Sequence, residues 1–200
     1  YTFVCYYNCH SNFSFFWVCV NLHLPLHRLG CKSKAKKAVI QIIMSNKDYI
    51  NKAFIELGKF LSQFTTTPPQ KQDGIQYNDL FFDAFKHQIK LAKEHNGWFI
   101  DSNIEYSFSS WCKTLTKNNI NHWLSKYNFN IEEPKTVAII MAGNIPLVGF
   151  HDFLSVLITG HNVLVKQSSN DKHLLPLLAK YLEYIEPSLK GKISFTEEHE

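Results

Sequence analysis

The chain has 200 residues, of which 45% are hydrophobic and 19% are charged. This composition allows a buried core and excludes a disordered chain, and the length suffices for one domain or slightly more. The formal net charge of +4 suggests a polyanionic partner. However, residues 1–43 hold five basic and no acidic residues, which leaves 16 basic and 17 acidic residues in the rest of the chain. We therefore expect no nucleic-acid partner.

Cysteine usage divides the chain at the same place. Four of the five cysteines lie in residues 1–43, and only Cys112 follows. A single cysteine in the remaining chain indicates a reduced, cytoplasmic protein without a disulfide framework. Cys112 is interpreted as a small buried hydrophobe and not as a nucleophile, because Lys113 is the only cationic neighbour that can lower its pKa. Cys5 and Cys9 have no matching second pair, so no metal site is expected.

The residues before Met44 differ from all that follows them. Their basic residues come after the apolar run, whereas a signal peptide carries them before it. The apolar run, residues 13–26, is interrupted by polar residues and a proline and is shorter than the ~20 residues of a membrane span. We therefore expect residues 1–43 to be a non-native upstream extension, with a targeting or anchoring segment as the alternative. Met44 is then the natural start, and Ser45 with Asp48 approximates a helix-capping box.

Residues 44–134 are predicted to form a helical region. Apolar residues recur every three or four positions along four segments, as on the buried faces of amphipathic helices. These segments are residues 50–64, 78–95, 104–115 and 120–127. We expect Pro68 to stop the first helix, Asn96 and Gly97 to form the C-cap of the second, and Asp101 or Ser102 to cap the third.

Residues 135–200 show a different pattern, in which short β-branched runs alternate with helical segments. Strands are expected at residues 136–141, 162–166 and 192–195, and helices at residues 150–159 and 174–185. Residues 168–171 offer N-caps for the second of these helices. The alternation predicts an α/β fold with a parallel, doubly wound sheet. We interpret this part as the truncated start of a Rossmann-like nucleotide-binding domain.

Polar segments follow the first two strands, at the sheet edge where ligands bind. The G-x-G-x-x-G and P-loop motifs are absent. Asn144 carries an amide that can donate to a developing oxyanion, although asparagine is also a common turn residue. Lys166 can bind phosphate or ribose hydroxyls, or simply extend its charge to solvent from the strand end. Ser168 and Ser169 can bind a phosphate at a helix N-terminus or cap that helix.

Two stretches resemble a known family. Residues 137–171, VAIIMAGNIPLVGFHDFLSVLITGHNVLVKQSSND, resemble the first β-α-β unit of the aldehyde dehydrogenase superfamily. The combination of AGNIPLVGFHDFLSVL with VLVKQSS is similar to the LuxC-type long-chain acyl-CoA reductases. Residues 96–127 also resemble the helical segment that precedes the cofactor domain in that family. The likeness covers residues 44–200, so the chain looks like an N-terminal fragment of such a reductase.

The resemblance implies an enzymatic reaction for the complete protein, the NADPH-dependent reduction of an acyl-CoA or other acyl thioester to the aldehyde. Asn144 matches the asparagine whose amide helps to form the oxyanion hole. The cysteine nucleophile of the family lies beyond Glu200, and Cys112 does not match it. The fragment itself is therefore expected to be inactive. Two alternatives stay open: a non-catalytic interaction domain with the same fold, and an aldehyde-oxidising dehydrogenase of the same superfamily.

The resemblance also implies a cofactor site. Lys166 matches the lysine that contacts the adenosine ribose or its 2′-phosphate. Ser169 occupies the position of a glutamate in NAD-preferring members, and the missing carboxylate favours NADPH over NADH, which stays a second option. The peptide groups of the first turn should line this site, together with Ser168. That turn comprises Ile140, Met141, Ala142 and Gly143. A homo-oligomer is a further possibility that the sequence leaves open.

Overall fold

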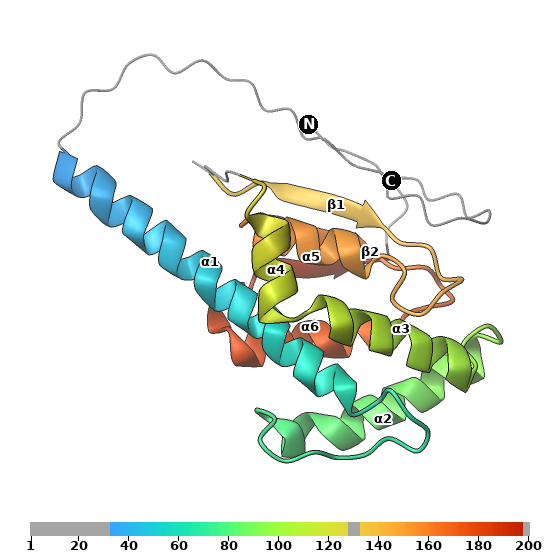
Figure 1. The fold of residues 1–200 in the computed structure, drawn as a ribbon. Helices are drawn as coiled ribbons and strands as arrows, with labels where there is room; N and C mark the ends of the chain where they lie inside the picture. The colour runs from blue at the N-terminus through green and yellow to red at the C-terminus, as the bar shows by residue number, and fades with distance from the viewer. Residues whose placement is uncertain (1–32, 128–132, 198–200) are drawn as a thin grey trace.

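A computed structural model describes residues 33–127 and 133–197 as helices packed on a small sheet (Figure 1). The elements in chain order are α1 (Ser33–Ser62), α2 (Asn78–His95), α3 (Asp101–Thr114), α4 (Lys117–Leu124), β1 (Thr136–Ile140), α5 (Phe150–Ile158), β2 (Asn162–Lys166), α6 (Leu174–Ile185), the 3-10 helix η1 (Pro187–Leu189) and β3 (Ile193–Thr196). The predicted α/β class is confirmed.

The three strands form a parallel sheet in the order β1-β2-β3. Thr136 pairs with Asn162 at the start of β1 and β2, and Ile140 pairs with Lys166 at their ends. Because successive strands are neighbours, two crossovers of the usual right hand place α5 and α6 on the same face. Figure 1 shows both helices on one side of the sheet, where α1 also contacts them.

The parallel sheet is present as predicted, but double winding, with helices on both faces, is not seen in the part of the chain that the structure describes. Strand order never reverses there, so no described helix covers the second face of the sheet. Ile140 accordingly remains 44% exposed. A parallel sheet is normally covered on both faces. The apolar strand sequences had suggested such two-sided burial, but they do not reveal the direction in which the chain moves along the sheet.

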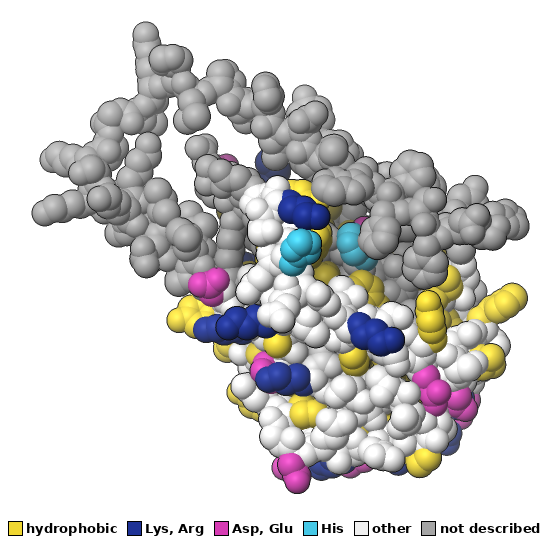
Figure 2. Space-filling model, in the orientation of Figure 1, with side chains coloured by type: hydrophobic (Ala, Val, Ile, Leu, Met, Phe, Trp, Pro, Cys, Tyr) yellow, Lys and Arg dark blue, Asp and Glu magenta, His cyan; other side chains and the backbone are white. Residues whose placement is uncertain are grey.

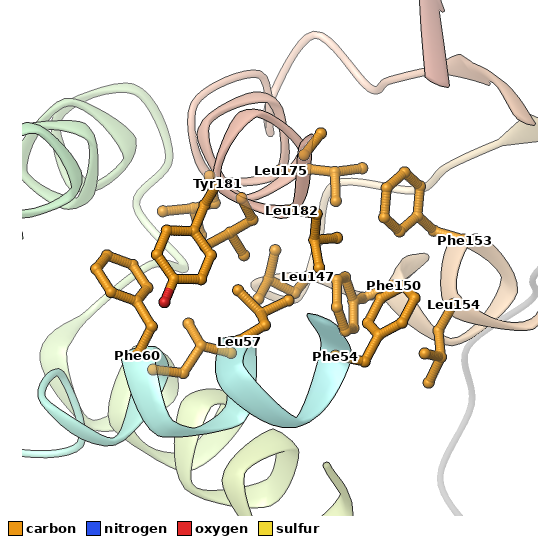
Figure 3. Close-up of a cluster of buried hydrophobic side chains, with 14 of the residues drawn as sticks. Phe54, Leu57, Phe60, Leu147, Phe150, Phe153, Leu154, Leu175, Tyr181 and Leu182 are labelled. Atoms are coloured by element: carbon orange, nitrogen blue, oxygen red, sulfur yellow. The ribbon is translucent and has the colours of Figure 1, made fainter. Parts of the chain in front are cut away.

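The helical region and the β-α-β unit share one hydrophobic core. Phe54, Leu57 and Phe60 of α1 point toward Leu147 and the face of α6 (Figure 3). Phe60 stacks on Tyr181 with ring centroids 4.4 Å apart. Both rings are fully buried. The aromatic stripes of the predicted helices are therefore core, as the sequence indicated.

The ends of the helices correct several expectations. Helix α1 begins at Ser33 and passes through Met44, so Ser45 lies inside the helix and the expected capping box is wrong. Helix α3 begins with Ile100 at its N-cap and no side-chain cap bond. Asp101 is the first residue of the helix and not its cap, and its carboxylate accepts a hydrogen bond from Lys93 at 2.5 Å.

Most of the expected upstream extension, residues 1–32, lies outside the described residues. Among the helices of the described part, none has both the length and the apolar character to cross a membrane.

Candidate functional site

The two segments singled out in the sequence meet at the carboxyl edge of the sheet. We refer to residues 141–149 as the β1–α5 loop and to residues 167–173 as the β2–α6 loop. A Cβ atom at Gly143 would lie 2.5 Å from Ser168 Oγ and 3.2 Å from the Cβ of Asn170. Only glycine therefore allows the loops to pack this closely. The expectation that both segments lie at one edge is confirmed.

Asn144 presents its side chain to solvent at this edge. Its amide makes no hydrogen bond to any described residue, and its φ is not positive. The local turn therefore uses neither of the special properties that make asparagine a turn former. The amide is free to bind a ligand.

The loop beyond Asn144 is held by its surroundings. The Ser107 hydroxyl donates to the Pro146 carbonyl over 2.7 Å. Leu147 has a φ of 59°, which is rare for a residue with a Cβ. Its side chain is only 3% exposed and lies between Leu57 and Leu182 (Figure 3). Core packing at Leu147 thus holds a backbone conformation that is unfavourable by itself.

Asn96 joins both loops, which the sequence did not indicate. Its Nδ2 donates to the Gly143 carbonyl at 2.6 Å and to the Asn170 carbonyl at 3.1 Å. Its Oδ1 accepts a hydrogen bond from the Trp98 amide at 3.0 Å. Asn96 is the C-cap of α2, as predicted, with its backbone extended at φ −135° and ψ 109°. The bonded carbonyls lie 47 and 74 residues away, so no local pattern could have revealed them.

Lys166 ends β2, half-buried, and its carbonyl accepts the Met141 amide at 2.9 Å. This bond and the pairing of Ile140 with Lys166 continue the sheet to its edge. The Gly143 carbonyl is taken by Asn96. The backbone groups of Met141 and Gly143, which were expected to line a cofactor site, therefore also make hydrogen bonds that hold the fold together. Ala142 lies between these two residues and is half-buried.

The β2–α6 loop forms a turn of its own before α6 begins. The Ser168 hydroxyl accepts the Asn170 amide at 3.2 Å, and the Ser168 carbonyl accepts the Asp171 amide at 3.1 Å. Helix α6 begins at Leu174 with His173 at its N-cap and no side-chain cap bond. The expected capping by residues 168–171 is therefore wrong, because these groups satisfy the turn. Ser169 is exposed and available.

Asp171 is a buried carboxyl group behind the two loops. It is 7% exposed, and its Oδ1 has no hydrogen-bond partner among the described residues. Burial raises the pKa of Asp171 to about 6, while the backbone N–H of Leu147 opposes this rise. Sequence reasoning missed this group, because an aspartate in a polar turn usually caps a helix at the surface.

A histidine pair connects the end of α2 to the start of α6. His173 Nε2 lies 3.1 Å from His95 Nδ1, and His173 Nδ1 lies 3.2 Å from the side-chain oxygen of Gln88. Burial and the neighbouring His95 lower the pKa of His173. This favours the neutral form of His173, and the contact between the two rings reinforces the packing of α2 on the β2–α6 loop.

Two features lie outside this site. The Cys112 thiol is half-buried and donates to the Gly58 carbonyl at 3.3 Å, and burial raises its pKa to about 11. This agrees with an inert cysteine.

A groove of about 360 Å³ runs between α2 and α3. Three lysines and three carboxylates line it, so it has no net charge with which to select an ion. In the described residues, no cluster of three metal-ligating side chains occurs.

Several apolar side chains are exposed close in sequence to the residues that bond to the β1–α5 loop. Trp98, Ile100 and Tyr106 are 71%, 54% and 65% exposed. Figure 2 shows hydrophobic side chains projecting at the right edge of the molecule, over the turn between α2 and α3. Trp98 follows Asn96 closely, and Tyr106 precedes Ser107, so both are near residues that bond to the loop. Ile145, within the loop, is itself 44% exposed.

Comparisons with known proteins give no match for this chain among family models, curated sequences or solved structures.

Proposed function

We propose that this chain is the N-terminal part of an NADPH-dependent acyl-CoA reductase with an aldehyde dehydrogenase-like, Rossmann-type cofactor domain. The observation that carries the proposal is the contact between Gly143 and Ser168. It brings together, at the carboxyl edge of a parallel sheet, the two segments on which the family resemblance depends. Ligands of α/β proteins bind at this edge.

The side chains at the edge fit a phosphorylated dinucleotide. Lys166 supplies a cation, and the Ser168 and Ser169 hydroxyls supply donors next to it in the chain. Asp171 is buried behind the loops and not exposed toward a ligand, so no carboxylate of residues 166–171 opposes a 2′-phosphate at the surface. Lys166, Ser168 and Ser169, with the peptide groups of residues 140–143, would hold the dinucleotide. When bound, it would supply the hydride for reduction.

Asn144 is assigned the role of oxyanion donor. Its amide is exposed and unengaged among the described residues. A neutral N–H donor held in place stabilises the negative charge that develops on a thioester oxygen. Exposed apolar side chains at Trp98, Tyr106 and, within the β1–α5 loop, Ile145 suit a substrate with an acyl chain. The cysteine nucleophile is expected outside this chain, which by itself should not reduce acyl-CoA.

Nucleotide binding by this chain tests the proposal. NADPH should bind, and Lys166→Ala should weaken its binding by on the order of 10- to 100-fold, the usual effect of losing a hydrogen bond to a charged group. Lys180→Ala, on the exposed side of α6, is the matched control and should bind NADPH like the wild type. Binding is measured by the change in NADPH fluorescence, with NADH in parallel. Absence of NADPH binding, or an equal loss in both variants, would contradict the proposal.

A further inference from the structure

Asn96 is engaged at every polar position of its side chain. Its two N–H groups each reach a different carbonyl, one in the β1–α5 loop and one in the β2–α6 loop. Its oxygen holds the Trp98 amide in the turn that follows α2. The residue is only 6% exposed, so water does not compete effectively for these bonds. Three segments far apart in the sequence therefore meet at one side chain.

Asparagine is the residue type that this arrangement requires. Aspartate has the same shape, but it would place an ionised oxygen against the Gly143 and Asn170 carbonyls. Three acceptors without a donor would then face one another in a buried position, which is strongly unfavourable.

Asn96 differs from the other contacts of these loops. Ser107 bonds only to Pro146 of the β1–α5 loop. Gly143 approaches Ser168 closely, but close approach does not fix a direction as a hydrogen bond does. Asn96, by contrast, donates hydrogen bonds to both loops at once.

We infer that Asn96 is a positioning residue of the nucleotide site: through Gly143 and Asn170, it sets how the two loops stand relative to each other. The carbonyl of Gly143 immediately precedes Asn144, and Asn170 immediately follows Ser169. The helical region therefore contributes to a site that the sequence places wholly in the β-α-β unit. The functional part of this inference rests on the proposed function, whereas the loop clamp itself does not.

The experiment compares Asn96→Asp and the milder Asn96→Ala with Asn103→Asp in the same 200-residue chain. Asn103 is a matched control, because its amide also donates to a backbone carbonyl, that of Trp98, but does not reach either loop. Hydrogen–deuterium exchange is followed in peptides from residues 141–149 and 167–173. NADPH affinity and the melting temperature are measured on the same samples.

Both Asn96 variants should exchange faster in both loops, by on the order of 10-fold, because two buried hydrogen bonds are lost. Their NADPH affinity should fall by on the order of 10-fold as well, while Asn103→Asp keeps wild-type values. Wild-type exchange in both loops of Asn96→Ala would overturn the clamp. Faster exchange with unchanged NADPH affinity would overturn the positioning role. If the wild type binds no NADPH, the proposed function fails, and loop exchange still decides whether Asn96 is the clamp.

Discussion

At the scale of single residues, burial and hydrogen bonding separate the groups available to a ligand from those that hold the fold. Asn144 and Ser169 are exposed, whereas Asn96 and Asp171 are buried. Asn96 has every polar atom satisfied, but Asp171 has an unpartnered oxygen. These two buried groups therefore have opposite effects on stability. Asn96 stabilises the folded loops, and an ionised Asp171 destabilises them.

Asn144 gives a test in which stability and activity separate. Its exposed side chain forms no hydrogen bond with any described residue. Asn144→Ala should therefore change the free energy of unfolding by less than about 0.5 kcal/mol. Under the proposed function, the same change in the complete protein should lower kcat by on the order of 10²-fold with little change in KM. Thermal melting and steady-state kinetics measure the two quantities. Near-normal kcat together with a clearly lower Tm would make Asn144 a turn residue only.

Asp171 predicts a pH dependence of stability. Its folded pKa of about 6 lies above its ordinary value of 3.8, so between these values the folded state binds more protons than the unfolded state. Stability from this group is therefore present below about pH 4 and is lost as the pH rises through 6, by on the order of 3 kcal/mol. Asp171→Asn should abolish this part of the pH dependence.

Urea denaturation at pH 4.5 and pH 7 checks the prediction for Asp171. The variant should gain stability relative to the wild type at pH 7 more than at pH 4.5. Asp83→Asn, on the exposed surface of α2, is the control and should follow the wild type at both values. Equal differences at the two pH values for Asp171→Asn would show that its carboxyl group does not titrate in this range.

At the scale of elements, helix α1 connects the helical region to the candidate site. Leu57 is fully buried and lies next to Leu147, the residue that anchors the β1–α5 loop (Figure 3). Leu147 needs this packing because its backbone conformation is itself unfavourable. A change on α1 should therefore reach a loop about 90 residues further along the chain.

Leu57→Ala tests this connection. The cavity should reduce the free energy of unfolding by about 2–5 kcal/mol and speed amide exchange in residues 141–149. Circular dichroism during urea denaturation and hydrogen–deuterium exchange measure both effects. Lys52→Ala, on the exposed side of α1, should change neither. A destabilised variant whose β1–α5 loop exchanges at the wild-type rate would show that the loop does not depend on α1.

At the scale of the whole molecule, one core joins two parts that the sequence presents as different regions. Phe60 of α1 stacks on Tyr181 of α6, and α2 also packs on α6. The opposite face of the sheet lacks such cover in the described residues, and Ile140 and Phe195 remain 44% and 40% exposed. The cover on one face explains why β1 is less buried than its apolar sequence suggested.

Local sequence determined the elements whose boundaries depend on near neighbours. Helices α2 and α6 and strand β2 have the predicted bounds, because apolar period and helix-breaking residues act within a few positions. The parallel pairing of β1 with β2 also followed from the β-α-β order. Because parallel strands end at the same edge of the sheet, this order also predicted that the segments containing Asn144 and Lys166 lie at one edge.

Tertiary structure alone decided how polar groups near helix ends are used and which face of the sheet is covered. Asn96 caps α2 through its backbone, as predicted, but its side chain bonds to two distant loops, which no local pattern indicated. A buried polar side chain bonds to whichever partner packing brings within reach, since leaving it unpaired is unfavourable. That partner can lie anywhere in the chain, and local patterns in a single sequence carry no signal of it.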